Sequence, residues 1–272
     1  MFPKFLDGIP IIQERELEGE IQFATISKNK AGQYHAAITV IREIEVLEYS
    51  DNSIGLDLNV KELVDSNGNR YENPRPARKY KDRLKLLHQK VSRSVKGTKG
   101  RAKAKQKLAK LYQHIHNVRE DWLHKLSRKI VGENQVICLE DLCIKDMLAK
   151  TKPEDRVEKR CEGKKRHRDI QDCGWYSLVQ KLLYKSKWYG RQCIRIDRWY
   201  PSSQTCHHCG HRNRELKPTD RVWMCLECWE LNDRDYNAAV NIKTVGMTGL
   251  ADCPGVRPAM SGLLVGSETP TL

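Results

Sequence analysis

The sequence predicts an α/β fold in which helices pack on a mixed β-sheet. Short apolar runs at residues 54–60, 135–142 and 192–199 have the length and composition of buried strands. Apolar residues recur at helical spacing in residues 78–130 and 175–190, between those strands. With 272 residues, the chain is long enough to bury a substantial core.

The first expected element is a β-hairpin. Residues 20–48 alternate in the manner of strands, and Gly32 supplies the turn between them. The strand at 54–60 follows, and a Ser-Asn-Gly sequence at 66–68 marks a second turn. We expect a parallel or mixed sheet to begin here.

The helical segment at 78–130 carries the excess charge of a chain whose net charge is +14. The sequence "SVKGTKG" at 94–100 interrupts the pattern, which predicts two helices joined as a basic hairpin. Residues 75–130 contain 19 Lys/Arg and 3 Asp/Glu, whereas the remainder contains 30 and 32. Such a face is typical of proteins that bind phosphate backbones, and a solvated helical surface is the alternative. The candidate nucleic-acid contacts are Arg93, Lys96, Lys99, Arg101, Lys103, Lys105 and Lys107.

The remaining elements complete the sheet. Residues 151–172 are dense in charge and lack periodicity, so we expect a loop or flexible connector there. The amphipathic helix at 175–190 and the strand at 192–199 follow. The last helix lies within 233–246, where Ala238 and Ala239 suit close packing on a sheet.

Four cysteines have the spacing of a zinc site. They form two Cys-x-x-Cys pairs separated by fifteen residues, and four thiolates can surround Zn²⁺ as a tetrahedron at about 2.3 Å. The intervening span is long enough for a β-hairpin, which predicts a zinc ribbon; four core thiols are the alternative. The predicted ligands are Cys206, Cys209, Cys225 and Cys228. Three nearby histidines are left outside the coordination shell, namely His207, His208 and His211.

Three acids stand out by their context. Asp57 interrupts a strand, Glu140 ends one, and Asp235 lies in the first turn of the last helix. Three carboxylates that converge suit hard cations such as Mg²⁺, and a pair of Mg²⁺ ions can hydrolyse a phosphodiester. Each acid also has a simpler interpretation. Asp57 could face solvent on an edge strand, Glu140 could start a loop or cap the next helix, and Asp235 could interact only with the helix dipole. The order strand-acid, strand-acid, helix-acid suits a ribonuclease-H-like sheet. Asp233 is expected to act mainly as an N-cap.

Composition argues against membrane and secreted classes of protein. The mean hydropathy is −0.68, and no uncharged apolar run approaches the ~18 residues of a membrane span. The N-terminal sequence has no signal-peptide pattern. We therefore expect a cytoplasmic protein without a membrane partner, whose ten cysteines are metal ligands or core thiols rather than disulfides.

Several stretches together resemble the TnpB/OrfB family of insertion-sequence proteins. They are "GLDLNVKELVDSNG", "LHKLSRKIV", "VICLEDL", "LLYKSKWYGRQCIRIDRWYPSSQTCHHCG", "VWMCLECW" and "DRDYNAAVNI", and they run from about residue 54 to 242. Members are transposon-encoded, RNA-guided DNA endonucleases related to compact type V CRISPR nucleases. "Transposase" is a label of this family rather than a mechanism.

The resemblance implies a RuvC-like nuclease with Asp57, Glu140 and Asp235 as catalytic acids that bind Mg²⁺. It implies that the four cysteines hold structural zinc in the target-nucleic-acid-binding insertion. It also implies DNA and a guide RNA as partners, with the basic hairpin touching the guide or heteroduplex. A prokaryotic cytoplasm with nucleoid association is the matching location.

The chain departs from the family pattern at two positions and at its start. Asn59 stands where the family has glycine, and Trp229 stands where the second Cys knuckle has glycine, so a distorted turn is expected there. Only the last strands of the family's N-terminal β-barrel wedge are recognisable, which suggests an N-terminal truncation. We expect these parts: 1–50 a partial wedge remnant, 51–200 a RuvC-like core with the basic helical segment 78–130, 201–230 the zinc ribbon, 231–246 the last RuvC helix, and 247–272 a disordered tail.

Two functions follow. The first is Mg²⁺-dependent hydrolysis of DNA guided by RNA. The alternative is a catalytically impaired, truncated product that only binds nucleic acid, an interpretation that the two departures and the partial wedge motivate.

Overall fold

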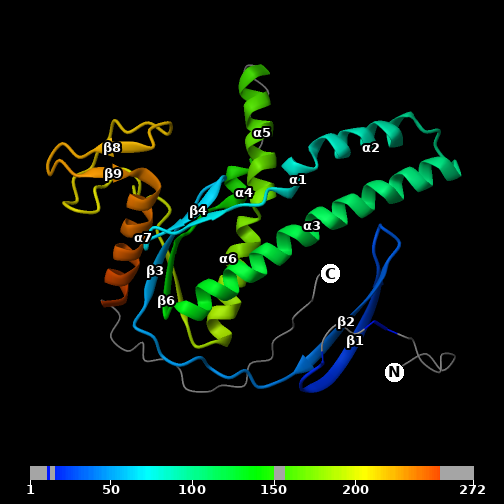
Figure 1. Ribbon diagram of the computed structural model, residues 1–272, viewed down its shortest axis with the longest axis horizontal. Helices are drawn as coiled ribbons and strands as arrows, with labels where there is room; N and C mark the ends of the chain where they lie inside the picture. The colour runs from blue at the N-terminus through cyan, green and yellow to red at the C-terminus, as the bar shows by residue number, and fades with distance from the viewer. Residues whose placement is uncertain (1–10, 13–15, 150–156, 252–272) are drawn as a thin grey trace. The chain divides into compact units, whose positions relative to one another are not determined.

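The computed structural model describes residues 11–12, 16–149 and 157–251, which form two compact units (Figure 1). The described part of the first unit comprises residues up to 44 and residues 82–114. The second unit comprises residues 45–81 and the described residues from 115 onward.

The first unit contains the predicted N-terminal hairpin. Strands β1 (Glu20–Lys28) and β2 (Tyr34–Ile41) pair antiparallel. Gly32 has a φ of 87° in the turn between them, as expected for the residue that reverses the chain. The hairpin prediction is therefore confirmed, while its assignment to a wedge barrel stays a prediction.

The basic helical hairpin is also confirmed. Helix α2 (Lys81–Arg93) and helix α3 (Lys99–Glu133) are separated by residues 94–98, inside the predicted break. Helix α3 is long enough to begin in the first unit and end in the second.

A five-stranded mixed sheet forms the centre of the second unit, with the strand order β5-β4-β3-β6-β7. Its first three strands are antiparallel neighbours, and β6 and β7 extend the sheet in parallel from β3. This arrangement confirms the expected ribonuclease-H-like, α/β mixed sheet. The strands are β3 (Ser53–Leu58), β4 (Glu62–Asp65), β5 (Arg70–Glu72), β6 (Val136–Glu140) and β7 (Gln192–Ile196).

Helices cover both faces of this sheet (Figure 1). On one face, Leu56 and Leu139 pack with Leu123 of α3 and Leu182 of α6 in the main core. On the other face, Cys138 packs with α7, where Ile242 is fully buried. The helices of this unit, besides the end of α3, are α1 (Pro76–Lys79), α4 (Ile144–Met147), α5 (Val157–Cys173), α6 (Trp175–Trp188) and α7 (Arg234–Ala251).

Helix α5 corrects one prediction. The sequence indicated a loop or connector at 151–172, but the described part from Val157 onward is helical. Its Lys, Arg and Glu side chains are good helix formers, although they give no apolar stripe. Near its end, buried Asp172 accepts hydrogen bonds from two backbone N–H groups of α1 and forms an ion pair with Arg119 of α3 at 2.7 Å. Tertiary contacts therefore fix a helix that periodicity does not reveal.

Two further boundaries differ from expectation. The hairpin of the predicted zinc ribbon consists of β8 (Val222–Met224) and β9 (Leu231–Asp233), so it flanks the second cysteine pair instead of lying between the pairs. Helix α7 continues to Ala251, five residues beyond 246. The remainder of the predicted tail, 252–272, lies outside the described residues. None of the described helices has the length and apolar character that crossing a membrane requires.

Candidate active site and zinc ribbon

Strands β3 and β6 bring two of the predicted acids together. Leu56 pairs with Leu139 in parallel register, so Asp57 and Glu140 follow at the same level of adjacent strands. Side chains alternate across a strand, and Gly55 faces α7. Asp57 therefore projects from the α7 face of the sheet.

Helix α7 brings the third acid to the same face. A Cβ on Gly55 would collide with the backbone carbonyl of Ala239, so this glycine lets α7 lie directly on β3. Asp233 caps the helix, because its Oδ1 accepts a hydrogen bond from the Tyr236 N–H at 2.9 Å. The predicted N-cap is thus confirmed, and Asp235 lies in the first turn.

The pKa of Asp57 reflects its burial and the charges of the other two acids. Burial, followed by the negative charges of Glu140 and Asp235, raises the pKa of Asp57 to about 8. Burial also raises the pKa of Glu140 above its ordinary value. Burial and the neighbouring charges thus favour the protonated form of Asp57, and a bound divalent cation would favour its ionised form.

Each carboxylate has its own polar neighbour. The Asn59 amide donates to Asp57 Oδ2 at 2.6 Å. The Ser202 hydroxyl donates to Glu140 Oε1 at 2.5 Å. Arg221 lies 3.3 Å from Asp235. Asn59, the residue that departs from the family pattern, is thus a hydrogen-bond donor to the Asp57 carboxylate.

The cysteines form a much tighter cluster. Among the described residues, they are the one group of three or more Cys, His, Asp or Glu whose ligand atoms all lie within 4.8 Å of one another. The Sγ atoms of Cys206 and Cys228 are 3.7 Å apart, and those of Cys209 and Cys225 are 3.5 Å apart. A tetrahedron with Zn–S bonds of about 2.3 Å has edges of about 3.8 Å. The four thiols therefore fit Zn²⁺, and the three histidines stay outside the cluster as expected.

Backbone N–H donors lower the pKa of two of the four thiols. Burial alone would raise the pKa of Cys225, but the backbone N–H groups of Cys228 and Glu227 donate to its sulfur and lower the pKa to about 7. A thiolate is the form that binds zinc. The pKa of Cys206 is lowered in the same way, whereas at Cys209 and Cys228 a backbone donor is outweighed by burial and by hydrogen bonds with the other sulfurs, which raise the pKa of Cys228 to about 12. The backbone therefore favours the ligating thiolate at Cys206 and Cys225 only.

The two knuckles have matching backbones despite their different sequences. Gly210 and Trp229 each follow the second cysteine of a pair, with φ angles of 78° and 59°. In each case the N–H donates to the carbonyl of the first cysteine, at 2.9 Å to Cys206 and 3.0 Å to Cys225. The expected distortion at Trp229 is therefore absent, and this side chain is 71% exposed. The cost is a tryptophan in a left-handed conformation that suits glycine.

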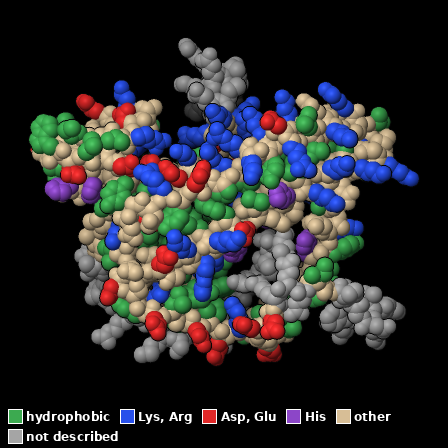
Figure 2. Space-filling model, viewed as in Figure 1, with side chains coloured by type: hydrophobic (Ala, Val, Ile, Leu, Met, Phe, Trp, Pro, Cys, Tyr) green, Lys and Arg blue, Asp and Glu red, His purple; other side chains and the backbone are tan. Residues whose placement is uncertain are grey.

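The predicted nucleic-acid contacts lie on the helical hairpin of the first unit. Six of the seven are exposed, and Figure 2 shows Lys and Arg side chains along α2 and α3. Arg101 differs, because its guanidinium donates to the carbonyls of Val91 and Ser94 at 2.8 and 2.7 Å. It thereby holds the end of α2 against α3, a structural role that sequence reasoning missed.

A further basic cluster lies in the second unit, and the sequence pattern did not indicate that its two segments form neighbouring helices. Helices α1 and α5 carry it, and the charge-dense sequence of α5 does not indicate a helix because it lacks apolar periodicity. Its exposed members are Arg78, Lys79, Lys164, Lys165, Arg166 and Arg168.

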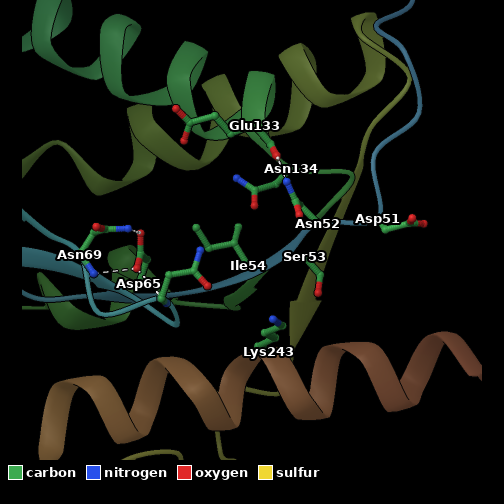
Figure 3. Close-up of a pocket in the computed structure, with 10 residues that line it drawn as sticks. Asp51, Asn52, Ser53, Ile54, Asp65, Asn69, Glu133, Asn134 and Lys243 are labelled. Atoms are coloured by element: carbon green, nitrogen blue, oxygen red, sulfur yellow. Dashed lines mark hydrogen bonds between the residues drawn. The ribbon is translucent and has the colours of Figure 1, made fainter.

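One surface pocket lies apart from Asp57, Glu140 and Asp235. It has a volume of about 430 Å³ and is lined by polar side chains, including Asn52, Ser53 and Lys243 (Figure 3). Ser53 begins β3, whereas Asp57 lies near its end, so pocket and acids occupy different ends of the strand. Buried Asp65 at its edge accepts hydrogen bonds from the backbone and side chain of Asn69 and organises the β4–β5 turn.

Comparisons with known proteins identify relatives of two parts of the chain. Residues 36–151 match the family described as "Probable transposase" (OrfB_IS605), and residues 175–242 match the family described as "Cas12f1-like, TNB domain".

Three curated proteins illustrate the wider similarity. One named "Putative RNA-guided DNA endonuclease", from Streptomyces pristinaespiralis, is 35% identical over 86% of this chain and 55% of its own length. Escherichia coli (strain K12) InsQ, which bears the same name, is 30% identical over 87% and 60%. The CRISPR-associated endodeoxyribonuclease Cas12f1 of Sulfoacidibacillus thermotolerans is 32% identical over 59% and 35%. The chain thus spans little more than half the length of the first two relatives.

One solved structure also aligns with part of this chain. The cryo-EM structure of a Cas12f1–sgRNA–target DNA complex aligns with 77% of this chain and 42% of that chain, at 20% identity and a TM-score of 0.49.

Proposed function

We propose that the chain is a member of the TnpB/OrfB family of insertion-sequence proteins and a metal-dependent DNA endonuclease whose active-site acids are Asp57, Glu140 and Asp235. The observation that supports the proposal is geometric: Asp57 and Glu140 follow paired residues of adjacent strands, and Asp235 lies in the first turn of α7, which packs on the same face of the sheet. The raised pKa of Asp57 accords with this, because burial and then the charges of Glu140 and Asp235 cause it. Carboxylates from two strands and one helix therefore act on one another on one face of the sheet.

The chemistry that Mg²⁺ supplies at such a site is activation of water and stabilisation of the leaving oxygen of a phosphodiester. The chain's own residues prepare it. Asp57 must give up its proton before it can act as a ligand, and Asn59 stabilises the ionised form by donating to Oδ2. Ser202 holds one oxygen of Glu140, which leaves Oε2 available.

The proposed partners are DNA and a guide RNA. The exposed lysines and arginines of α2 and α3 supply phosphate contacts without base recognition. We assign the same role to the basic cluster of α1 and α5 in the second unit. The relatives' names motivate RNA guidance, and a prokaryotic cytoplasmic location near the nucleoid accords with it.

The zinc ribbon has a structural role in this proposal. Four cysteines complete the coordination shell of Zn²⁺ and leave no open position for water. The metal would fix residues 206–228 and return the chain to the sheet at α7, so hydrolysis belongs to the carboxylates.

Cleavage of single-stranded DNA in the presence of Mg²⁺ tests the proposal, with and without added RNA. The wild type is compared with Asp57→Ala and with the control Asp141→Ala. Asp141 is the immediate neighbour of Glu140, but it is half exposed and forms an ion pair with Arg195 at the surface. We expect Asp57→Ala to abolish cleavage and Asp141→Ala to retain it. Equal cleavage by the wild type and Asp57→Ala would sink the proposal, and binding without cleavage by all three would favour the binding-only alternative.

A further inference from the structure

A line of buried polar side chains runs from the cysteine cluster to Glu140. Such residues are uncommon in a core unless each one is hydrogen-bonded. These are 6% exposed or less, and they are Ser202, Asn232, Asn237 and Asn241.

At the zinc end, Asn232 contacts a predicted metal ligand. Its Nδ2 lies 3.6 Å from Cys206 Sγ, and the same group donates to the Glu230 carbonyl at 3.1 Å. Its Oδ1 lies 3.0 Å from His207 Nδ1. Because the amide donates on one side, the oxygen is fixed toward the histidine.

His207 contacts Asn237 of α7 through its backbone and its side chain. Its backbone N–H donates to Asn237 Oδ1 at 2.9 Å, and its Nδ1 lies 3.0 Å from the same oxygen. Both neighbours of Nδ1 are amide oxygens, so Nδ1 carries the proton. The residue directly after the first zinc ligand is thus held by two asparagines.

Two asparagines on one face of α7 then hold the loop that carries Ser202. Asn237 Nδ2 donates to the carbonyls of Ser202 and Thr205 at 3.2 and 2.8 Å. Asn241, one turn later, donates to the same two carbonyls at 2.8 and 2.6 Å. The Ser202 hydroxyl completes the line at Glu140.

We infer that Ser202 and Asn237 are positioning residues that couple zinc binding at the cysteines to the orientation of the Glu140 carboxylate. Cys206 lies four residues after Ser202, in a segment that Asn237 and Asn241 fasten to α7. Zinc fixes Cys206, the asparagines transmit that position along the segment, and the Ser202 hydroxyl sets Glu140. The inference rests on the proposed function, since it takes Glu140 as a ligand of the catalytic cation.

The coupling predicts that the cation affinity of the carboxylates depends on Ser202 and on zinc. Mn²⁺ binding to the full chain, followed by calorimetry and by electron paramagnetic resonance, measures that affinity without requiring cleavage. Loss of a group that orients a metal ligand typically costs about 10–100-fold in metal affinity. We expect Ser202→Ala to weaken Mn²⁺ binding by about that factor while zinc content stays at one ion per chain, and Ser202→Thr, which keeps a hydroxyl, to restore it.

Zinc removal completes a thermodynamic cycle. Cys228→Ser is the suitable variant, because Cys206, and not Cys228, contacts Asn232. We expect zinc-depleted Cys228→Ser to bind Mn²⁺ as weakly as Ser202→Ala, and the double variant to be no weaker than either. Mn²⁺ prefers oxygen ligands, so vacated thiols do not imitate the carboxylate site.

Glu140→Gln separates the inference from the proposed function. If Glu140→Gln binds Mn²⁺ like the wild type, Glu140 is not a ligand and the proposed function fails with the inference. If Glu140→Gln weakens binding but Ser202→Ala does not, the inference is wrong and the proposed function stands. Full Mn²⁺ affinity after zinc depletion would likewise overturn the coupling. Should Cys228→Ser fail to fold, Mn²⁺ binding by Ser202→Ala that is as tight as binding by Ser202→Thr would still overturn the inference.

Discussion

Replacing Trp229 by glycine should tighten zinc binding by the ribbon. Trp229 has a φ of 59°, in the left-handed region, although its side chain has a Cβ and is 71% exposed. Its N–H bond to the Cys225 carbonyl at 3.0 Å does not depend on the side chain. Glycine therefore removes backbone strain and gives up little packing.

The size of the effect follows from two opposing terms. A left-handed conformation costs a non-glycine residue about 1–2 kcal/mol. Glycine's greater freedom in the unfolded chain offsets about 0.5–1 kcal/mol of that gain. The net gain is about 0.5–1 kcal/mol, or about two- to fivefold in zinc affinity, because ribbon folding and zinc binding are linked.

Competition with a chromogenic zinc chelator measures this difference. Gly210 provides the matched control, since it occupies the same position of the first knuckle with a φ of 78° and has open space where a Cβ would be. Gly210→Ala should weaken zinc binding, as Trp229→Gly strengthens it. Weaker zinc binding by Trp229→Gly, together with unchanged binding by Gly210→Ala, would refute the reasoning.

Three other predictions concern buried ionisable groups. Because the pKa of Asp57 is raised to about 8, about 1% of the molecules have an ionised Asp57 at pH 6 and half have one at pH 8. The apparent Mn²⁺ affinity measured by calorimetry should therefore rise about 50-fold between pH 6 and pH 8. The Asp57→Asn variant should bind Mn²⁺ weakly, with no such dependence on pH. In the metal-free protein, the contribution of Asp57 to stability should be fully present below about pH 4 and be lost as the pH rises through about 8, because the folded chain retains a proton that the unfolded chain releases. Thermal melts over a series of pH values measure this loss. The same pH dependence in Asp57→Asn would contradict the prediction. Glu120→Ala leaves Lys181 buried without the carboxylate that lies 2.5 Å away, and it should lower the free energy of unfolding in urea by about 3–5 kcal/mol. Asp121→Ala, which removes an exposed ion pair with Lys125, should lower it by about 1 kcal/mol or less. Equal losses of stability in the two variants would contradict this prediction.

Much of the fold was predictable because its signals are local. The hairpin turn at Gly32, the apolar strand around Leu56 and the break before Lys99 each follow from a few neighbouring residues. Helix α5 was not predictable by the same means. Its order depends on Asp172 meeting Arg119 and the N-terminus of α1, partners that lie far away in the sequence.

The candidate site divides in the same way. The cysteine spacing indicated the zinc cluster, and acids at strand ends indicated the carboxylates. Ser202 and Asn237 carry no such signal, because a serine in a loop and an asparagine in a helix are ordinary residues there. The one available hint was a pair of asparagines at positions 237 and 241, one turn apart beside buried alanines on a helix expected to pack on the sheet.

The effect of Mg²⁺ on DNA cleavage by Asp235→Asn tests the central claim most directly, with Asp233→Asn as its neighbour and control. Both carboxylates lie at the start of α7, but Asp233 caps the helix, whereas Asp235 acts on Asp57. Loss of a metal-ligating carboxylate should lower the rate by at least about 100-fold at every Mg²⁺ concentration. Asp233→Asn, which keeps an N-capping side chain, should cleave at nearly the wild-type rate. Cleavage by Asp235→Asn at the wild-type rate would contradict the assignment of the active site.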